Sequence, residues 1–352
     1  MKLEQIYNSL ISKGNTLKDT FYKKDILITG GCGSIGSEIV KQLIKYNPKR
    51  IKVFDNNESG LFYLQQRLNS PLIRTLVGDI RDRERLRMAV RGTDIIFHAA
   101  ALKHVPLCEY NPFEAVYTNV IGTQNLVGVA RDEQVDKFIT ISTDKAVNPI
   151  NTMGATKLLS EKLVMTADIG DWCKTKFSCV RFGNVLDSIA SVIPIFKRQI
   201  KRGGPVTITS KEMVRFFMSM PEAVNLVLKT ASLAKGRDIF ILKMDKIKII
   251  DLAEVMIEKI APQYGHKPED IKIKTIGIRP GEKLDEQLIT EEEKEFLMDL
   301  GELYILKKPR IPHFRTSLVI KTKDIKERLD INNGRLLSKD EIGILLKKFN
   351  LC

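Results

Sequence analysis

Asp25-Ile26-Leu27-Ile28-Thr29-Gly30-Gly31-Cys32-Gly33-Ser34-Ile35-Gly36 is the stretch of this 352-residue chain that decides its fold. Its first five residues read as a buried strand, its glycines allow a tight turn, and Ser37 to Tyr46 has helical periodicity. In such a unit, backbone amides approach a pyrophosphate at the positive end of the helix dipole. We therefore expect five residues to bind the phosphates of a dinucleotide, namely Gly30, Gly33, Ser34, Ile35 and Gly36.

A carboxylate follows the second predicted strand. Arg50 to Phe54 reads as that strand and leads into Asp55, about twenty residues beyond the glycine turn, where an acid suits a ribose diol. Asp55 would also repel a 2′-phosphate, and no Arg or Lys follows in Asn56-Asn57-Glu58. We therefore expect NAD as the cofactor, with NADP as the alternative, and place Asp55, Asn56 and Glu58 in its binding site.

The alternation of strands and helices continues along the chain. The predicted elements are strands at 72–77, 94–98 and 137–141 and helices at 60–68, 83–91 and 112–131. Five strands with intervening helices make an α/β fold with a doubly wound parallel sheet, which is a Rossmann fold. Where these strands end we expect further cofactor contacts, from Asp79 (at the adenine ring), Ile80, Ala99, Ala101 and Lys103.

Several parts of the chain together resemble the extended short-chain dehydrogenase/reductase family. They are Thr29 to Gly36, Asp79, His98-Ala99-Ala100-Ala101, Asn119 and Lys157. Finer strings are similar to the nucleotide-sugar 4,6-dehydratases of capsule and flagellin glycosylation, whose characterised members act on UDP-N-acetylglucosamine. These strings are Ser142 to Pro149, Met153 to Lys157, Arg181 to Leu186 and Arg279 to Lys283. The resemblance runs from about Lys24 to Leu288 and implies that Asn119 belongs to the cofactor site.

The reaction that this resemblance implies removes water from a hexose and leaves the cofactor unchanged overall. Hydride leaves C4, the ketone makes the C5 proton acidic, the C6 hydroxyl departs and hydride returns at C6. In ordinary dehydrogenases of the superfamily a tyrosine takes the C4-hydroxyl proton. This chain has Met153 at that place, and methionine cannot exchange a proton.

The neighbours of Met153 must then move the protons. We assign the C4- and C6-hydroxyl protons to Asp144, and the C5 proton to Lys145 as base. For that, burial and the positive charges of Lys157 and the oxidised nicotinamide should lower the pKa of Lys145. Thr143 is expected to hydrogen-bond the C4 oxygen, Lys157 to hold the nicotinamide ribose, and Met153 to fill the space of the missing ring.

The nucleotide half of the substrate is expected to lie against later parts of the chain. Planar guanidinium groups bind phosphate oxygens well, so Arg215 and Arg279 are the candidate diphosphate contacts. The other candidate substrate contacts are Lys103, Asn184, Val192, Thr207 and Glu282. His98 is expected to shape the cofactor site, and His104 has no assigned role. Many relatives carry a glycine and an arginine where this chain has Asp187 to Ser191, so this loop near the substrate is expected to differ.

The sequence also suggests how the chain is divided. An amphipathic helix is expected within 1–23, with apolar residues at helical spacing over 2–13. The dinucleotide-binding domain is expected over 24–184 and 216–262, the nucleotide-sugar-binding region over 185–215 and 263–330, and a tail helix over 331–352. Larger members of the resembled group carry membrane helices ahead of this domain, so this chain resembles the soluble branch.

Composition excludes several other classes. The net charge of +14 is spread along the chain without an interleaved aromatic motif, so we expect no nucleic-acid partner. Five cysteines without CxxC spacing indicate neither disulfides nor a zinc site, and no metal is expected. No apolar run is long enough to span a membrane and no signal peptide is evident. We expect a cytoplasmic homo-oligomer that binds a UDP-sugar.

Two other functions stay open. A nucleotide-sugar 4-epimerase would share the fold and the first hydride transfer, but it needs no elimination at C6. A dinucleotide-sensing protein without catalysis would not require Asp144, Lys145 and Lys157 together.

Overall fold

The computed structural model describes residues 16–168, 173–189, 191–307 and 331–351. The amphipathic helix expected over 2–13 lies outside these residues. The first described helix is α2 (Leu17–Phe21), whose N-terminus is closed by a capping box between Thr16 and Asp19. Phe21 is buried and packs into the main core, so the start of the described chain is anchored to the domain that follows it.

One large sheet organises the molecule, with strand order β13-β14-β10-β6-β5-β4-β1-β2-β3. Its parallel strands are β1 (Asp25–Thr29), β2 (Arg50–Asp55), β3 (Ile73–Val77), β4 (Ile95–His98), β5 (Lys137–Ile141), β6 (Lys176–Arg181) and β10 (Asp238–Leu242). An antiparallel pair, β14 (Leu303–Leu306) and β13 (Leu297–Asp299), extends one edge. The predicted doubly wound parallel sheet is confirmed. The chain reverses its order of strands between β1 and β4, and such sheets bind ligands at that point.

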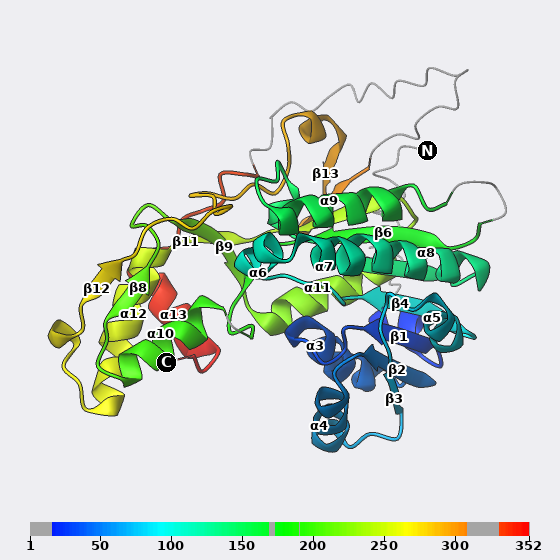
Figure 1. Cartoon of the computed structure of the whole chain (residues 1–352), viewed down its shortest axis with the longest axis horizontal. Coiled ribbons are helices and arrows are strands. Elements are labelled where there is room, and N and C mark those ends of the chain that lie inside the picture. Colours follow the sequence, from blue (N-terminus) through cyan, green and yellow to red (C-terminus); the bar gives the residue numbers. More distant parts are fainter. Residues whose placement is uncertain (1–15, 169–172, 190, 308–330, 352) are drawn as a thin grey trace.

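Two apolar cores cover the two faces of this sheet. Strand β1 shows the division, because Ile26 and Ile28 pack into one core and Leu27 into the other. The first core is completed by α3 (Ser34–Leu43), α4 (Glu58–Leu68) and α11 (Met220–Leu233), and the second by α5 (Arg83–Val90), α8 (Thr123–Asp132) and α9 (Thr152–Met165). Figure 1 shows the helices on either side of the strands. The result is a three-layer α/β domain.

The helix predicted over 112–131 is interrupted, which corrects that prediction. It consists of α7 (Pro112–Val116), a π-helical turn over Tyr117–Gly122, and α8, and it is preceded by α6 (Val105–Tyr110). A π turn inserts one extra residue into a helix and often occurs at functional sites. Here the turn contains Asn119, whose side chain is buried against the loop that follows β4.

A second region lies to one side of the sheet, at the left in Figure 1. Its strands are β7 (Asn184–Val185), β9 (Val214–Met218) and β11 (Asp245–Lys248) in one sheet, and β8 (Val206–Ile208) with β12 (Ile273–Thr275) in another. Its helices are α10 (Val192–Lys201), α12 (Ile249–Ile260) and α13 (Lys339–Lys348), which share a third core. Short 3-10 helices occur at Ile44–Tyr46, Asp144–Ala146, Ala261–Tyr264, Pro268–Asp270 and Glu292–Phe296. The predicted domain boundaries stay a prediction.

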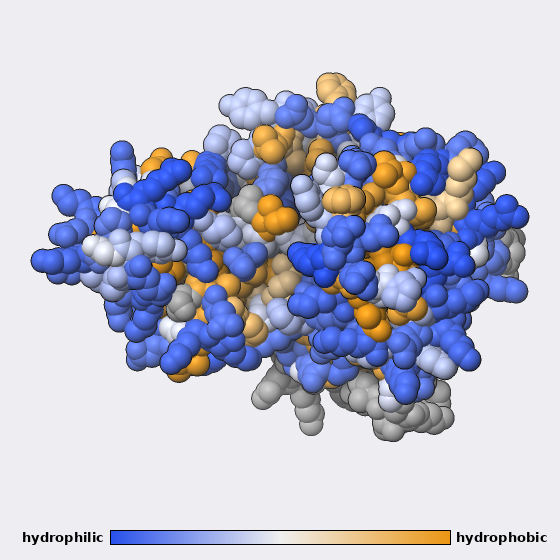
Figure 2. Space-filling model, turned by 90° about the horizontal axis from the view of Figure 1, so that it is seen from below, coloured by the Kyte–Doolittle hydropathy of each residue, from blue (hydrophilic) through white to orange (hydrophobic). Residues whose placement is uncertain are grey.

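Hydrophilic side chains cover most of the face in Figure 2, and apolar side chains lie between them in separate groups. No helix among the described residues is long and apolar enough to cross a membrane.

Candidate active site

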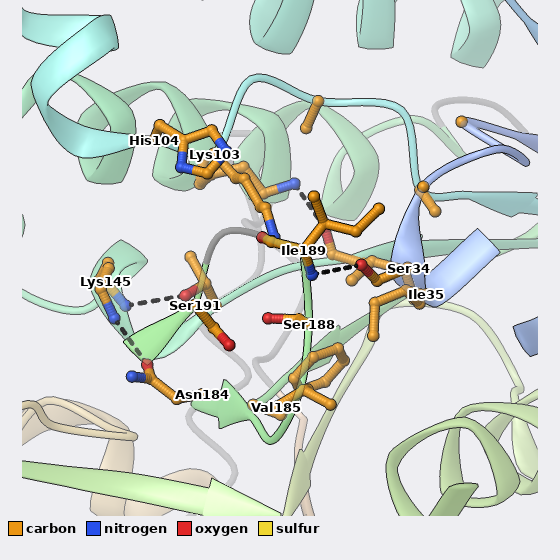
Figure 3. A pocket seen from close by; sticks show the side chains of 18 of the residues that line it. Ser34, Ile35, Lys103, His104, Lys145, Asn184, Val185, Ser188, Ile189 and Ser191 are labelled. Atoms are coloured by element: carbon orange, nitrogen blue, oxygen red, sulfur yellow. Dashed lines mark hydrogen bonds between the residues drawn. The ribbon is translucent and has the colours of Figure 1, made fainter. Parts of the chain in front are cut away.

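A cavity of about 520 Å³ opens at the carboxyl ends of the central strands. Five segments line it: the glycine turn after β1, the loop 99–104 after β4, residues 141–145 at the end of β5, the start of α9, and the segment 182–192 after β6. Figure 3 shows side chains from these segments converging on one space. The cavity therefore lies at the switch point of the sheet, where the sequence predicts it.

The glycine turn forms one end of the cavity and can accept a phosphate. Gly30 has φ +67°, and a Cβ there would lie 2.5 Å from the amide nitrogen of Ala100. A Cβ on Gly36 would collide with the carbonyl oxygen of Gly30. Gly33 is the N-cap of α3 and supplies no side-chain cap, so the amides of the first helical turn stay open to an anion. These features fit the pyrophosphate of a dinucleotide.

The predicted adenosine contacts lie beyond the lining of the cavity. Asp55 accepts hydrogen bonds from the amides of Cys32 (2.9 Å) and Asn57 (3.0 Å), and so links the glycine turn to the turn between β2 and α4. Asn56 and Glu58 are exposed beside it. These three residues form a polar edge next to the glycine turn.

Asp79 and Ile80 have other contacts. The guanidinium of Arg81 donates to the carboxylate of Asp79 at 2.7 to 3.0 Å, and these hydrogen bonds are the main cause that lowers the pKa of Asp79. Ile80 is buried, and a Cβ on Gly122 would collide with its side chain. The side chain of Ile80 therefore packs directly against the π turn at Gly122.

Asn119 fixes the loop after β4 from behind. Its carboxamide oxygen accepts from the amide of Leu102 (2.8 Å), and its nitrogen donates to the carbonyl of Leu102 (2.9 Å) and to the hydroxyl of Thr156 (3.0 Å). Asn119 is 1% exposed and does not line the cavity, whereas Lys103 does. Asn119 thus supports the loop that carries Lys103 through these hydrogen bonds, and its predicted place in the cofactor site stays a prediction.

His98 lies in the wall under this loop. Its Nδ1 is 2.7 Å from the Thr29 hydroxyl and its Nε2 is 2.9 Å from the Thr123 hydroxyl. Thr123 donates its proton to the carbonyl of Asn119, so Nε2 of His98 carries the proton that Thr123 accepts. Burial, with a smaller effect of Lys157, lowers the pKa of His98 to about 3. The ring is therefore neutral and structural.

The end of β5 places Thr143, Asp144 and Lys145 together. The Lys145 ammonium lies 3.0 Å from Oδ1 of Asp144, and the Thr143 hydroxyl donates to the same oxygen at 2.8 Å. Thr143 and Lys145 line the cavity, but Asp144 is fully buried behind them. Lys145 also donates to Oδ1 of Asn184 at 3.3 Å, an interaction drawn in Figure 3. Asp144 therefore reaches the cavity only through Thr143 and Lys145.

Lys145 has a second carboxylate neighbour, Glu286, at 3.5 Å. Burial is the largest single influence and lowers the pKa of Lys145, but the charges of Asp144 and Glu286 together outweigh it. The pKa of Lys145 is consequently raised. This corrects the expected lowering, because no sequence motif indicates that a second buried acid faces this lysine.

The first turns of α9 supply Met153 and Lys157. Met153 is 4% exposed, lines the cavity, and packs against Cys108 and Ala115. Lys157, one turn later, donates to the carbonyl of Ile141 at 2.5 Å. Burial lowers the pKa of Lys157 to about 8. The helix thus places an apolar side chain beside an ammonium group that loses its proton more easily than an exposed lysine does.

The candidate substrate contacts divide into two groups. Lys103, Asn184 and Val192 line the cavity. Arg215 does not: it is 5% exposed and donates to the carbonyls of Val214 (2.7 Å), Lys283 (2.7 Å) and Leu284 (3.0 Å). Both terminal nitrogens of its guanidinium therefore donate to backbone oxygens, and these bonds tie the 279–286 segment to β9.

The remaining candidates lie outside the cavity lining. Thr207 is in β8, where its hydroxyl accepts from Gln199 at 2.7 Å. Arg279 is exposed, and its amide donates to Glu282 at 3.2 Å. The Glu282 carboxylate also lies 3.8 Å from Arg215.

Ile189 lines the cavity but was not among the residues predicted for the site. Its amide donates to the Ser34 hydroxyl at 2.9 Å, and its carbonyl accepts from the Lys103 ammonium at 3.1 Å (Figure 3). The segment after β7 thus connects the glycine turn with the loop that follows β4. Only its position in the loop that departs from the resembled family pointed to it.

Known proteins are similar to this chain over most of its length. Residues 26–308 match the family described as polysaccharide biosynthesis protein. An uncharacterized membrane protein of Methanocaldococcus jannaschii is 57% identical over 94% of this chain and 97% of its own length. A UDP-N-acetylglucosamine 4,6-dehydratase (inverting) of Campylobacter jejuni is 41% identical over 81% of this chain and 83% of its own.

Other relatives differ in length or in the reaction named. The chain spans 46% of the length of the capsular polysaccharide biosynthesis protein CapD of Staphylococcus aureus, to which it is 46% identical over 77% of this chain. A UDP-glucose 4-epimerase of Rickettsia bellii is 40% identical over 81% of this chain and 83% of its own. Among solved structures, Pen from Bacillus thuringiensis is 40% identical with a TM-score of 0.86, over 94% of this chain and 99% of that one.

Proposed function

This chain belongs to the family of polysaccharide biosynthesis proteins, and we propose that it is a nucleotide-sugar 4,6-dehydratase that uses NAD. The proposed reaction converts UDP-N-acetylglucosamine to a UDP-2-acetamido-2,6-dideoxy-hexos-4-ulose for a surface glycan or protein glycosylation. The observation that carries the proposal is the Asp144–Lys145 ion pair beside the cavity. It offers an acid and a base at a site where Met153 replaces the usual proton carrier.

The C4-hydroxyl proton has a short path to the buried carboxylate. Thr143 faces the cavity and already donates to Oδ1 of Asp144. When the Thr143 hydroxyl accepts the substrate proton, it passes its own proton to Asp144. Bound NAD would supply the chemistry of accepting the C4 hydride and returning a hydride at C6.

This transfer also prepares the next step. Once Asp144 is protonated it has no charge, and one of the two carboxylates that raise the pKa of Lys145 is lost. Lys145, which lines the cavity, then releases its ammonium proton to solvent more readily, and as the neutral amine it takes the proton from C5 and returns it to C5 when hydride arrives at C6. Protonated Asp144 returns its proton through Thr143 to the departing C6 hydroxyl, which leaves as water. The substrate itself thereby provides the proton that the elimination needs.

The cofactor would lie along one side of the cavity. The glycine turn would hold its pyrophosphate and Lys157 its nicotinamide ribose, as a hydrogen-bond donor from the wall. Asp55, with Asn56 and Glu58, would bind the adenosine ribose, and its charge favours NAD over NADP. Asp79 and Ile80 stay predicted contacts of the adenine side.

The sugar would occupy the part of the cavity next to Lys103, Asn184 and Val192. Arg279 and Glu282 would then bind the nucleotide, because neither side chain is buried. Roles of Thr207 and Arg215 as direct substrate contacts stay predictions. A cytoplasmic location and a homo-oligomer also stay predictions.

The second candidate function is nucleotide-sugar 4-epimerization, which the similarity to the Rickettsia bellii protein favours. Incubation with UDP-N-acetylglucosamine and NAD, followed by mass spectrometry, separates the two. We expect a product that has lost one water. A product of unchanged formula with inverted C4 would support the epimerase, and the absence of any turnover would support a binding protein.

A further inference from the structure

Glu286 is a buried acid that no step described so far uses. It is 3% exposed and lies in the segment that follows Arg279 to Lys283, far along the chain from the end of β5. Its Oε1 is 3.5 Å from the ammonium of Lys145, which already pairs with Asp144 at 3.0 Å. Lys145 thus lies between two buried carboxylates that come from separate parts of the fold.

The hydrogen bonding of Glu286 is incomplete. Its Oε2 is buried and accepts no hydrogen bond from the described residues, and Oδ2 of Asp144 is in the same state. Lys283 lies 3.8 Å from Glu286 but donates to the carbonyl of Val147 at 2.8 Å. A buried acid with an unused oxygen is costly to keep unless its charge serves a neighbour.

A second buried cluster of the same chain shows the contrast. Arg181 binds Glu161 at 2.7 Å and Glu293 at 2.8 Å, and the Ser142 hydroxyl also donates to Glu161. That cluster pairs both acids directly with one guanidinium, as a purely structural ion network requires. Glu286 has no guanidinium partner: its Oε1 lies 3.5 Å from the Lys145 ammonium and its Oε2 lies 3.8 Å from the Lys283 ammonium without a hydrogen bond, so its geometry suits a different role.

We propose that Glu286 is a positioning residue that holds the ammonium of Lys145 at the cavity wall and governs when this lysine gives up or takes a proton. The proposal rests on the proposed dehydration. As Lys145 takes the C5 proton, positive charge develops on its Nζ, and the carboxylate of Glu286 stabilises that charge. Glu286 acts while Asp144 is protonated, because an uncharged Asp144 cannot stabilise this positive charge.

The charged groups around Lys145 fix the direction of the effect. Asp144 and Glu286 raise its pKa, while Arg215 lowers it. Lys283 is a further positive charge in this cluster, near Glu286. Replacing Glu286 by Gln removes one of the two charges that favour the ammonium. The variant should therefore have a lower pKa at Lys145 and a weaker base in the transition state.

The test compares Glu286→Gln with the wild type in two measurements. The first is trace acetylation of Lys145 at a series of pH values, read by mass spectrometry. Below both pKa values we expect about tenfold faster labelling in the variant, which corresponds to about one pKa unit. The second is the pH profile of kcat/KM for dehydration, whose acidic limb should move to lower pH while the plateau falls about threefold.

Two further variants serve as controls. Asp285→Asn removes the neighbouring charge, which is largely exposed and pairs with Lys246 at 2.6 Å, and it should change neither profile. Glu286→Asp keeps a carboxylate and should restore most of the wild-type labelling profile even if Glu286→Gln folds poorly.

Labelling of Lys145 that is the same in Glu286→Gln and the wild type, with normal product formation, would overturn the inference and leave the proposed function intact. Wild type that forms no 4-keto product would instead refute the proposed function.

Discussion

Lys145 and Asp144 form an ion pair of 3.0 Å in which only the lysine reaches the cavity. The carboxylate is fully buried behind it and is bridged to the cavity by the hydroxyl of Thr143 at 2.8 Å. An acid in this position cannot touch a substrate directly, but it can exchange protons through its two neighbours. The predictions below follow from this arrangement and from the groups around it.

Asp144→Asn should slow dehydration severely, with little change in the shape of the side chain. The amide cannot carry the C4-hydroxyl proton, so we expect turnover to fall about 10²- to 10⁴-fold. Binding of NAD and of the UDP-sugar, measured by calorimetry, should change far less. Asp285→Asn is the matched control and should keep wild-type turnover. Normal turnover in Asp144→Asn would refute the proton assignment.

Met153→Leu should be tolerated. Met153 is buried against Cys108 and Ala115, and leucine has nearly the same volume, so we expect a loss of less than about 1.5 kcal/mol in the free energy of unfolding. Turnover should stay within a few-fold of the wild type, because the side chain only fills space. A stable variant without turnover would show that the thioether itself takes part.

Lys157→Met should change how stability depends on pH. The pKa of Lys157 is about 8 in the folded chain against its ordinary value of 10.5, so between these values the unfolded chain binds more protons. The free energy of unfolding of the wild type should therefore rise with pH relative to that of the variant. We expect roughly 2 kcal/mol between pH 8 and pH 10, measured by urea denaturation. Parallel curves for the two proteins would contradict the low pKa.

Asn119→Asp should loosen the loop that carries Lys103. The carboxylate keeps the shape of the side chain but cannot donate to Leu102 or Thr156, so we expect a loss of about 1 to 3 kcal/mol in the free energy of unfolding. The KM for the UDP-sugar should rise with it. Asn125→Asp, on the same helix and bonded to an exposed carbonyl, is the control and should cost less. Equal effects of the two changes would argue against a positioning role for Asn119.

Local sequence patterns predicted the sheet well because each strand is a short apolar run that is bounded by turn residues. The apolar run Ile26 to Ile28 predicted β1, and the glycines after it predicted the end of the cavity that is suited to a phosphate. The π turn at Asn119 was not predictable from periodicity, because it arises from contacts with Leu102 and Thr156 that only the folded chain makes. Strand β10 was also missed, as no motif marks it.

The candidate site was predicted best where consecutive residues share a strand end. Thr143 and Lys145 fall in the cavity for that reason. The effect of Glu286 on Lys145 depends on a contact between distant segments, so the expected direction of the pKa shift was wrong. Arg215 was predicted as a phosphate contact from its residue type; its hydrogen bonds to backbone carbonyls depend on the folded chain, and the phosphate contact stays a prediction.

The most direct test of the proposed dehydration follows one hydrogen atom. UDP-N-acetylglucosamine that carries deuterium at C4 is incubated with the enzyme and NAD, and the product is examined by NMR. We predict a 4-keto-6-deoxy product with the deuterium at C6, since the hydride removed from C4 returns there after water has left. A product that retains the deuterium at C4 would contradict the account.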